Sequence, residues 1–267
     1  MVMQTWPEFT INFICHNEIE ILRKTLPHNL AQLCAGTKRG YDVILTVDGV
    51  EAAPRDDFLR LAEAHGVDEV RLRRRRSNCA SGDGANNGHL HAFSDKTRYL
   101  LTIEADIAFF RTDPDFDPLD AFVQFFDRHP KRPLIHQMDD HDCWVWKLEK
   151  AAKDVEAGVW SVNRIASHFL VYDTLGARQV KGFPDLGVYH DSQTAWFNFE
   201  DELSQLFAEP AGPGIAFPTD WPMRVYHCDR KLQEGSAHYC KSADVKLEVF
   251  EQRVKEVAAL TRRPAAE

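Results

Sequence analysis

The chain has 267 residues, a length that suits one large α/β domain. Its formal net charge of −9 argues against a broad surface for nucleic acid or for an anionic membrane. No run is long enough to span a bilayer, the start lacks a signal-peptide pattern, and the six cysteines are scattered without paired spacing. We therefore expect a cytoplasmic protein with reduced thiols, no nucleic-acid partner and no integral membrane segment. Association into a homo-oligomer is left open.

Strand and helix patterns alternate along the first part of the chain. Apolar runs predict strands at residues 9–15, 41–47, 69–73 and 99–110, and helical periodicity lies between them at residues 21–33, 54–65 and 89–93. Each strand pattern ends in polar residues. This alternation predicts a mostly parallel sheet with helices on its faces.

The second part of the chain is less regular. Helical patterns are predicted at residues 116–129 and 197–207, and short strands at residues 133–137, 167–172 and 224–228. Residues 243–263 form an amphipathic pattern. We expect this last helix to pack either on the body of the protein or on a partner.

Two carboxylates, Glu104 and Asp106, interrupt the apolar run that begins at Tyr99. Alternate side chains of an extended chain share a face, so both acids can point the same way. Neighbouring carboxylates repel one another, and a divalent cation that carries phosphate oxygens would relieve the repulsion. The alternative is a strand that ends in a solvated acidic loop.

Further polar residues follow the other predicted strands. Asn17 and Glu18 come directly after the first strand, and Asp48 follows the second. Ligands of open α/β sheets bind outside the carboxyl ends of the strands. One crevice could therefore hold these three residues together with Glu104 and Asp106.

The order of these motifs resembles that of the family-two-like glycosyltransferases, which are inverting nucleotide-sugar enzymes of the GT-A fold. Asn17 and Glu18 are similar to the Asn-Glu that ends the family's opening strand. Asp48 is similar to the acid that reads the nucleotide base, and Asn87 lies in a loop that resembles the one facing the nucleotide sugar. The resemblance thus implies a donor site made by these residues and Glu104.

The same resemblance implies a metal site and a catalytic base. Glu104 and Asp106 stand where the family has its metal-binding acid pair, usually Asp-x-Asp, and His227 is placed like the histidine that completes that site. Asp106 is the expected metal ligand, and Glu104 is expected at the metal or at the ribose. Glu200 and Asp201 match the acidic pair at a helix start that supplies the base; Asp201 is the first choice, and simple helix capping is the alternative.

The implied fold is a GT-A-like, Rossmann-like α/β sheet flanked by helices, with an irregular acceptor-binding C-terminal half. Residues 1–240 would form one domain, with a nucleotide-binding half at about 8–115 and an acceptor-binding half at about 116–240; residues 241–267 would add a helix and tail. The implied activity is metal-assisted, inverting transfer, with Mn²⁺ or Mg²⁺, from a nucleotide-sugar donor to the hydroxyl or amine of a small molecule or glycan.

Other functions fit parts of the sequence. A nucleotidyltransferase has a similar sheet and acidic metal site, but it usually carries a glycine-rich basic loop after the first strand, and residues 15–18 contain no glycine. A catalytically inactive nucleotide-sugar-binding module would account for Glu104 in place of the usual aspartate. A third reading treats all of these acids as helix caps and solvated loop ends.

Overall fold

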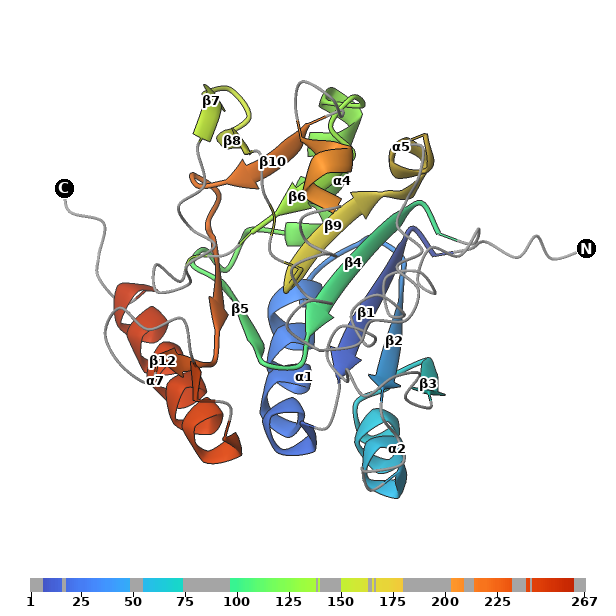
Figure 1. Cartoon of the computed structure of the whole chain (residues 1–267), viewed down its shortest axis with the longest axis vertical. Helices are drawn as coiled ribbons and strands as arrows, with labels where there is room; N and C mark the ends of the chain where they lie inside the picture. The colour runs from blue at the N-terminus through green and yellow to red at the C-terminus, as the bar shows by residue number, and fades with distance from the viewer. Residues whose placement is uncertain are drawn as a thin grey trace, which may run out of the picture.

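This computed structural model describes residues 7–15, 18–48, 55–73, 97–137, 139, 150–162, 165, 167–179, 203–208, 214–231, 239–240 and 242–261. Within these residues the strands form a nine-stranded sheet and two two-stranded sheets. The large sheet has the strand order β3-β2-β1-β4-β9-β6-β10-β8-β7 and crosses the whole molecule (Figure 1).

The first elements in chain order are β1 (Phe9–Cys15), α1 (Ile19–Cys34), β2 (Tyr41–Asp48), α2 (Arg55–Ala64), β3 (Glu69–Arg73), β4 (Tyr99–Glu104) and β5 (Ile107–Arg111). The middle elements are α4 (Pro118–Arg128), β6 (Leu134–His136), β7 (Lys150–Asp154), β8 (Val159–Val162), β9 (Phe169–Asp173) and α5 (Thr174–Arg178). The last elements are β10 (Ile215–Pro218), β11 (Met223–His227), β12 (Arg230–Lys231), β13 (Tyr239–Cys240) and α7 (Ala243–Thr261).

The centre of the large sheet is parallel and fully covered. Strand β1 pairs in parallel with both β2 and β4, and all of its residues are buried. This is the environment expected for an apolar strand with helices on both faces of the sheet. In the second half, β9 and β8 run antiparallel to their neighbours, while β6 and β10 keep the direction of β4. The sheet is therefore mostly parallel, as the strand–helix alternation predicts.

The apolar run at residues 99–110 differs from the single strand expected there. It divides into β4 and β5, with Ala105 and Asp106 in the turn between them. Strand β4 stays in the large sheet, whereas β5 leaves it and pairs only with β11 among the described strands. The division has a packing cause, because the residues of β5 are buried against α1 and β11 rather than beside β1.

The other predicted elements are confirmed within one or a few residues where the structure describes them. The predicted helix at residues 89–93 lies outside the described residues, and of the pattern at 197–207 only residues 203–207 are described, as helix. None of the described helices has the length and apolar character needed to cross a membrane.

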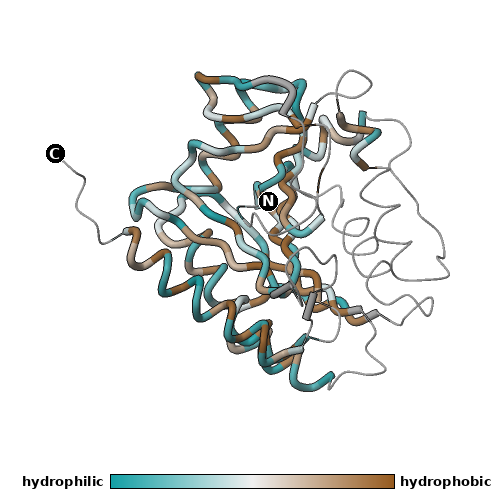
Figure 2. The backbone as a smooth tube through the Cα atoms, turned by 60° about the vertical axis from the view of Figure 1, so that its left-hand side comes forward, coloured by the Kyte–Doolittle hydropathy of each residue, from teal (hydrophilic) through white to brown (hydrophobic). Residues whose placement is uncertain are grey.

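Helix α7 packs on the body of the protein, which decides between the two expectations for it. It lies against α1 and β5 (Figure 1). Its buried residues Val249, Phe250 and Val257 join a small apolar cluster that includes Ile21 of α1 and Phe110 of β5. The outer face is polar, and the alternation of hydrophilic and hydrophobic residues along the helix is visible in Figure 2.

Candidate functional site

The turn between β4 and β5 brings Asp106 to the edge of the sheet where the central parallel strands end. Antiparallel pairing of β5 with β11 places His227 opposite Ile107, the residue that follows Asp106. The backbone continues this pairing, because Cys228 N donates a hydrogen bond to Asp106 O at 2.8 Å. The strand register therefore holds His227 next to Asp106.

His227 bridges two buried carboxylates. Its Nε2 lies 3.3 Å from Asp106 Oδ2, and its Nδ1 lies 3.6 Å from Asp229 Oδ2. Burial alone would lower the pKa of His227, but the charges of Asp106 and Asp229 outweigh burial and raise the pKa to about 9. At neutral pH the ring is therefore protonated, and each nitrogen carries a hydrogen that can face a carboxylate.

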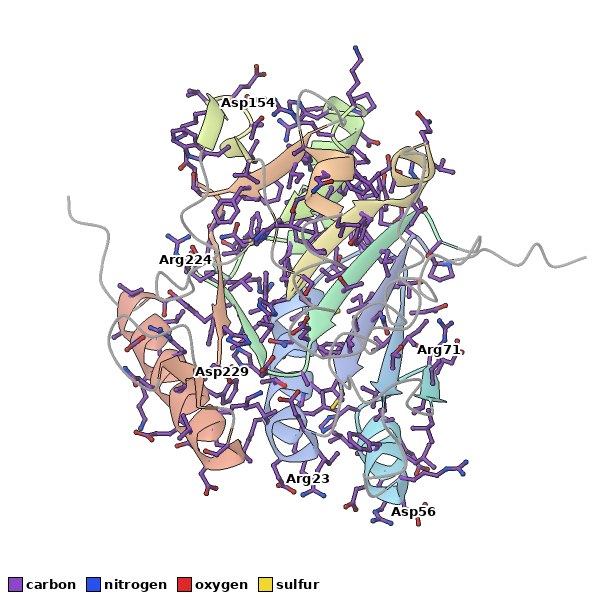
Figure 3. The ribbon with its side chains drawn as sticks, viewed as in Figure 1. Arg23, Asp56, Arg71, Asp154, Arg224 and Asp229 are labelled. Atoms are coloured by element: carbon purple, nitrogen blue, oxygen red, sulfur yellow. The ribbon has the colours of Figure 1, made fainter. Side chains whose placement is uncertain are left out.

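Lys246, in the first turn of α7, brings an ammonium group to the same carboxylates. Its Nζ lies 2.6 Å from Asp106 Oδ2 and 3.5 Å from Asp229 Oδ1, and it donates a hydrogen bond to Glu18 Oε1. Figure 3 shows Asp229 beside α7. The lysine side chain is only 2% exposed. We call the five residues Glu18, Asp106, His227, Asp229 and Lys246 the acidic centre.

Charge within the acidic centre is strongly coupled. Burial disfavours the charged form of Asp106, but Lys246 and His227 hold the pKa of this carboxyl well below its usual range. Burial would lower the pKa of Lys246, yet Asp106 and Glu18 raise it above its usual range. For Glu18, burial and the charge of Asp106 raise the pKa to about 7. Glu18 therefore holds its proton at a higher pH than an exposed glutamate does.

Glu104 lies next to the acidic centre with partners of its own. Its Oε2 is 2.8 Å from His168 Nδ1, and its Oε1 accepts a hydrogen bond from Ser167 Oγ at 3.1 Å. The ring of His168 stacks on that of His227, with centroids 4.7 Å apart. A continuous row of polar side chains therefore runs from Glu104 through the two histidines to Asp106.

A divalent cation fits one part of the acidic centre. Asp106, His227 and Asp229 each offer one ligand atom, and these atoms all lie within 4.8 Å of one another. Asp229 Oδ1 is buried and accepts no hydrogen bond, and its neighbouring cation is the Lys246 ammonium group at 3.5 Å. Two carboxylate oxygens and one imidazole nitrogen form a donor set that Mn²⁺ or Mg²⁺ can accept, provided that His227 gives up a proton.

The structure brings together three of the residues predicted from sequence, Glu18, Asp106 and His227, and places Glu104 beside them. Asp48 is the last residue of β2, the neighbour of β1. The other predicted residues, Asn17, Asn87, Glu200 and Asp201, lie outside the described residues.

Sequence reasoning missed Asp229, Lys246 and His168. Asp229 has a local signal, because it follows His227 by two residues in a segment that begins as a strand. Lys246 also has one: it precedes Val249 by three residues and so lies on the apolar face of the helical pattern. A lysine on such a face needs a buried anionic partner.

No protein-family model matches the sequence, and a search of curated proteins gives no match. Solved structures do match. A fragment of S. aureus TarS in complex with UDP-GlcNAc has a TM-score of 0.52 and 14% identity, over 97% of this chain and 68% of that chain. The mannosyltransferase PcManGT from Pyrobaculum calidifontis, in complex with GDP-Man and Mn²⁺, has a TM-score of 0.52 and 13% identity, over 98% and 77%.

A third similar structure is GalNAc-T7 with UDP, GalNAc and Mn²⁺, with a TM-score of 0.55 and 13% identity. The match covers 99% of this chain, which spans about half, 53%, of that chain. Identities this low establish similarity of fold, and the three matches each extend over nearly the whole of this chain. The protein therefore has the GT-A fold of these glycosyltransferases.

Proposed function

We propose that the protein is a glycosyltransferase that moves a sugar from a nucleotide-sugar donor to the hydroxyl or amine of an acceptor, with inversion at the anomeric carbon. The observation that carries this proposal is the acidic centre, which lies at the carboxyl ends of the parallel strands in a GT-A fold. The similar structures with UDP-GlcNAc, with GDP-Man and Mn²⁺, and with UDP and Mn²⁺ support the donor class.

The leaving group of such a reaction is a nucleoside diphosphate, on which negative charge builds as the bond to the sugar breaks. We assign Asp106, His227 and Asp229 as the residues that would hold a divalent ion, and Glu104 as their neighbour on the donor side. When bound, the ion would act as a Lewis acid that stabilises charge on the diphosphate. The carboxylates of Asp106 and Asp229 would keep it in place, and His227 would have to be neutral to contribute a nitrogen.

The acceptor needs a base on the face opposite the leaving group. We assign this role to Asp201, with Glu200 as the alternative, because these acids match the family's acidic pair at a helix start, and the helical residues 203–207 lie just after them in the chain. A base placed in this way removes the acceptor proton as the new bond forms. Attack from that face is what makes inversion the expected outcome.

Donor binding is proposed for Asn17, Glu18, Asp48, Asn87 and Glu104. We also propose one catalytic domain over residues 1–240, with the nucleotide-binding half at about 8–115, the acceptor-binding half at about 116–240, and α7 with the tail as an addition. A cytoplasmic location agrees with the reduced thiols at Cys15 and Cys34.

A thermal-shift panel tests the proposal. UDP, GDP, dTDP and CMP would each be added with and without Mn²⁺ to the wild-type protein and to Asp106→Asn. A ligand at a hundred times its dissociation constant stabilises the folded state by about 2.7 kcal/mol, which is a readily measured shift. We expect one nucleotide to raise the melting temperature when Mn²⁺ is present.

Asp106→Asn is expected to abolish that shift, because the amide loses the charge that holds the cation. Asp120→Asn is the matched control: Asp120 is a half-buried carboxylate of α4 paired with Arg39, and its loss should leave the nucleotide response unchanged. No response of the wild type to any nucleotide would contradict the proposed donor site.

A further inference from the structure

The ammonium group of Lys246 lies at the site where the proposed function requires a divalent metal ion. Its ammonium group is surrounded by three carboxylates, Glu18, Asp106 and Asp229. Two of these are the acids that, with His227, form the candidate metal site. Among the described residues, two basic side chains lie within 4 Å of both Asp106 and Asp229, and these are Lys246 and His227.

The ammonium and a divalent ion cannot occupy this place together. A hard divalent cation lies about 2 Å from each carboxylate oxygen that binds it. Lys246 Nζ is already 2.6 Å from Asp106 Oδ2 and 3.5 Å from Asp229 Oδ1. An ion bound to both oxygens would therefore be in contact with the ammonium group. Because both are positively charged, they would repel each other. One of the two cations must leave.

We propose that Lys246 and a divalent ion occupy the acidic centre in alternation, so that the first turn of α7 controls loading of the metal. The inference rests on the proposed function and names the regulation of its metal site. In the metal-free protein the lysine neutralises the carboxylates; when the ion binds, the ammonium group moves out.

The anchoring of α7 permits this exchange without undocking the helix. Lys246 is in the first turn, whereas Val249, Phe250 and Val257 hold the following turns in the apolar cluster under α7. Phe250 also makes an edge contact with His28 of α1, with ring centroids 5.3 Å apart. The long side chain of Lys246 can rotate away while these contacts persist.

Exchange also rearranges the charge of the site in a way that suits the donor. The ammonium group and the His227 proton leave and a divalent ion takes their place, so the net charge is unchanged, but both positive charges then lie on one ion that can bind phosphate oxygens directly. A nucleoside diphosphate would favour the metal-loaded state, since it binds that state more tightly. Metal and donor should therefore each increase the affinity for the other, and the lysine should oppose both.

Direct titration with Mn²⁺, followed by electron paramagnetic resonance of the free ion, tests the exchange on the full chain without donor. Lys246→Met keeps the apolar stem and removes the ammonium group. When a competing group fills most copies of a site, the apparent affinity for a ligand falls in proportion to the fraction of sites left open. Lys246→Met leaves every site open, so it should bind Mn²⁺ at least about tenfold more tightly than the wild type. Lys255→Met, at an exposed position of α7, should bind like the wild type.

A second measurement uses the wild-type protein, because Lys246→Met leaves buried carboxylates uncompensated and could fold poorly. Acetylation of lysines by a water-soluble reagent, read by mass spectrometry, reports on exposure. Lys246 should be protected without metal and labelled at saturating Mn²⁺, while Lys255 should be labelled in both conditions.

Two results would overturn the inference: equal or weaker Mn²⁺ affinity in Lys246→Met, or continued protection of Lys246 in the wild type at saturating Mn²⁺. Failure of the proposed function has a different signature, which is the absence of any nucleotide response in the thermal-shift panel. A protein that binds nucleotide with Mn²⁺ but keeps Lys246 protected would thus refute the exchange and leave the transferase proposal standing.

Discussion

His227 has two buried acidic neighbours, so its protonated form stabilises the folded protein. Its side chain is 13% exposed and lies between Asp106 and Asp229. In the metal-free protein its positive charge, with that of Lys246, offsets the charge of the surrounding carboxylates. Metal binding would require the loss of this proton, so the ion and the proton compete for His227.

We expect the stability of the metal-free protein to fall at alkaline pH. The folded state raises the pKa of His227 from 6.5 to about 9, so its contribution is complete below pH 6.5 and is lost as the pH rises through about 9. The contribution is about 3 kcal/mol. Chemical unfolding between pH 6 and pH 10 in the presence of a chelator measures it.

His227→Gln is expected to be less stable at pH 6 and to lack most of the decline toward pH 10. His65→Gln changes an exposed histidine after α2 and should keep the wild-type decline. Identical pH dependence in the wild type and in His227→Gln would show that His227 is not held as an imidazolium between the two acids.

Individual site residues could be predicted from sequence where local order was informative. Glu18, Asp106 and His227 each follow or end a recognisable strand, and the three side chains meet. Lys246 was not predicted, because its role depends on where α7 docks, and a single sequence does not specify which surface an amphipathic helix covers.

Side chains of helix α1 form hydrogen bonds with the backbone of β5, in place of the bonds that a neighbouring strand would form. Strand β5 pairs with β11 along one edge, and polar side chains of α1 bind backbone groups along the other. Asn29 Nδ2 donates to Ile107 O, and Phe109 N donates to Asn29 Oδ1, both at 2.8 Å. Further along the same face, Arg111 N donates to Gln32 Oε1 at 2.9 Å. These bonds fix β5 and hence the turn that carries Asp106.

Asn29→Ala should therefore destabilise the protein strongly, although the side chain that it removes is polar. It would leave the buried Ile107 carbonyl and Phe109 amide without their partner, at a cost of about 2–4 kcal/mol. Urea unfolding measures the change. Lys24→Ala, at an exposed position of the same helix, should stay within about 0.5 kcal/mol of the wild type, and an equally small effect of Asn29→Ala would refute the edge-pairing role.

The sequence shows that α1 is amphipathic, but not that its polar residues serve a strand. Asn29 is fully buried and lies among the apolar positions of the helix. Its partners are about eighty residues away in the chain. The apolar run at residues 99–110 likewise reads as one strand, because the turn at Ala105 and Asp106 contains neither glycine nor proline.

At the level of the whole molecule, strand pairing could be predicted from the sequence better in the first half of the sheet than in the second. In the first half, strands and helices alternate, which predicts a parallel sheet, and the structure has one with the strand order β3-β2-β1-β4. In the second half, β9 inserts between β4 and β6 in the antiparallel sense, and β10 joins β6 and β8 from a distant part of the chain. Such long-range pairings carry no local signal in the sequence.

In the proposed transferase, the acidic centre would hold the metal ion beside the donor diphosphate, and Asp201 would take the proton of the acceptor. Three activities are distinguished by their products. A glycosyltransferase releases a nucleoside diphosphate from the donor, a nucleotidyltransferase releases pyrophosphate, and an inactive binding module releases neither.

The most direct measurement is product analysis after incubation of UDP-sugars and GDP-sugars with the wild-type protein, Asp201→Asn and Glu200→Gln in the presence of Mn²⁺. The wild type should release the nucleoside diphosphate, even if only slowly to water. Asp201→Asn should lower the rate by about 10²–10⁴-fold and still bind the nucleotide, because it removes a positioned base and not the donor site. Glu200→Gln should lower the rate less. Release of pyrophosphate, or nucleotide binding with no turnover by the wild type, would contradict the account.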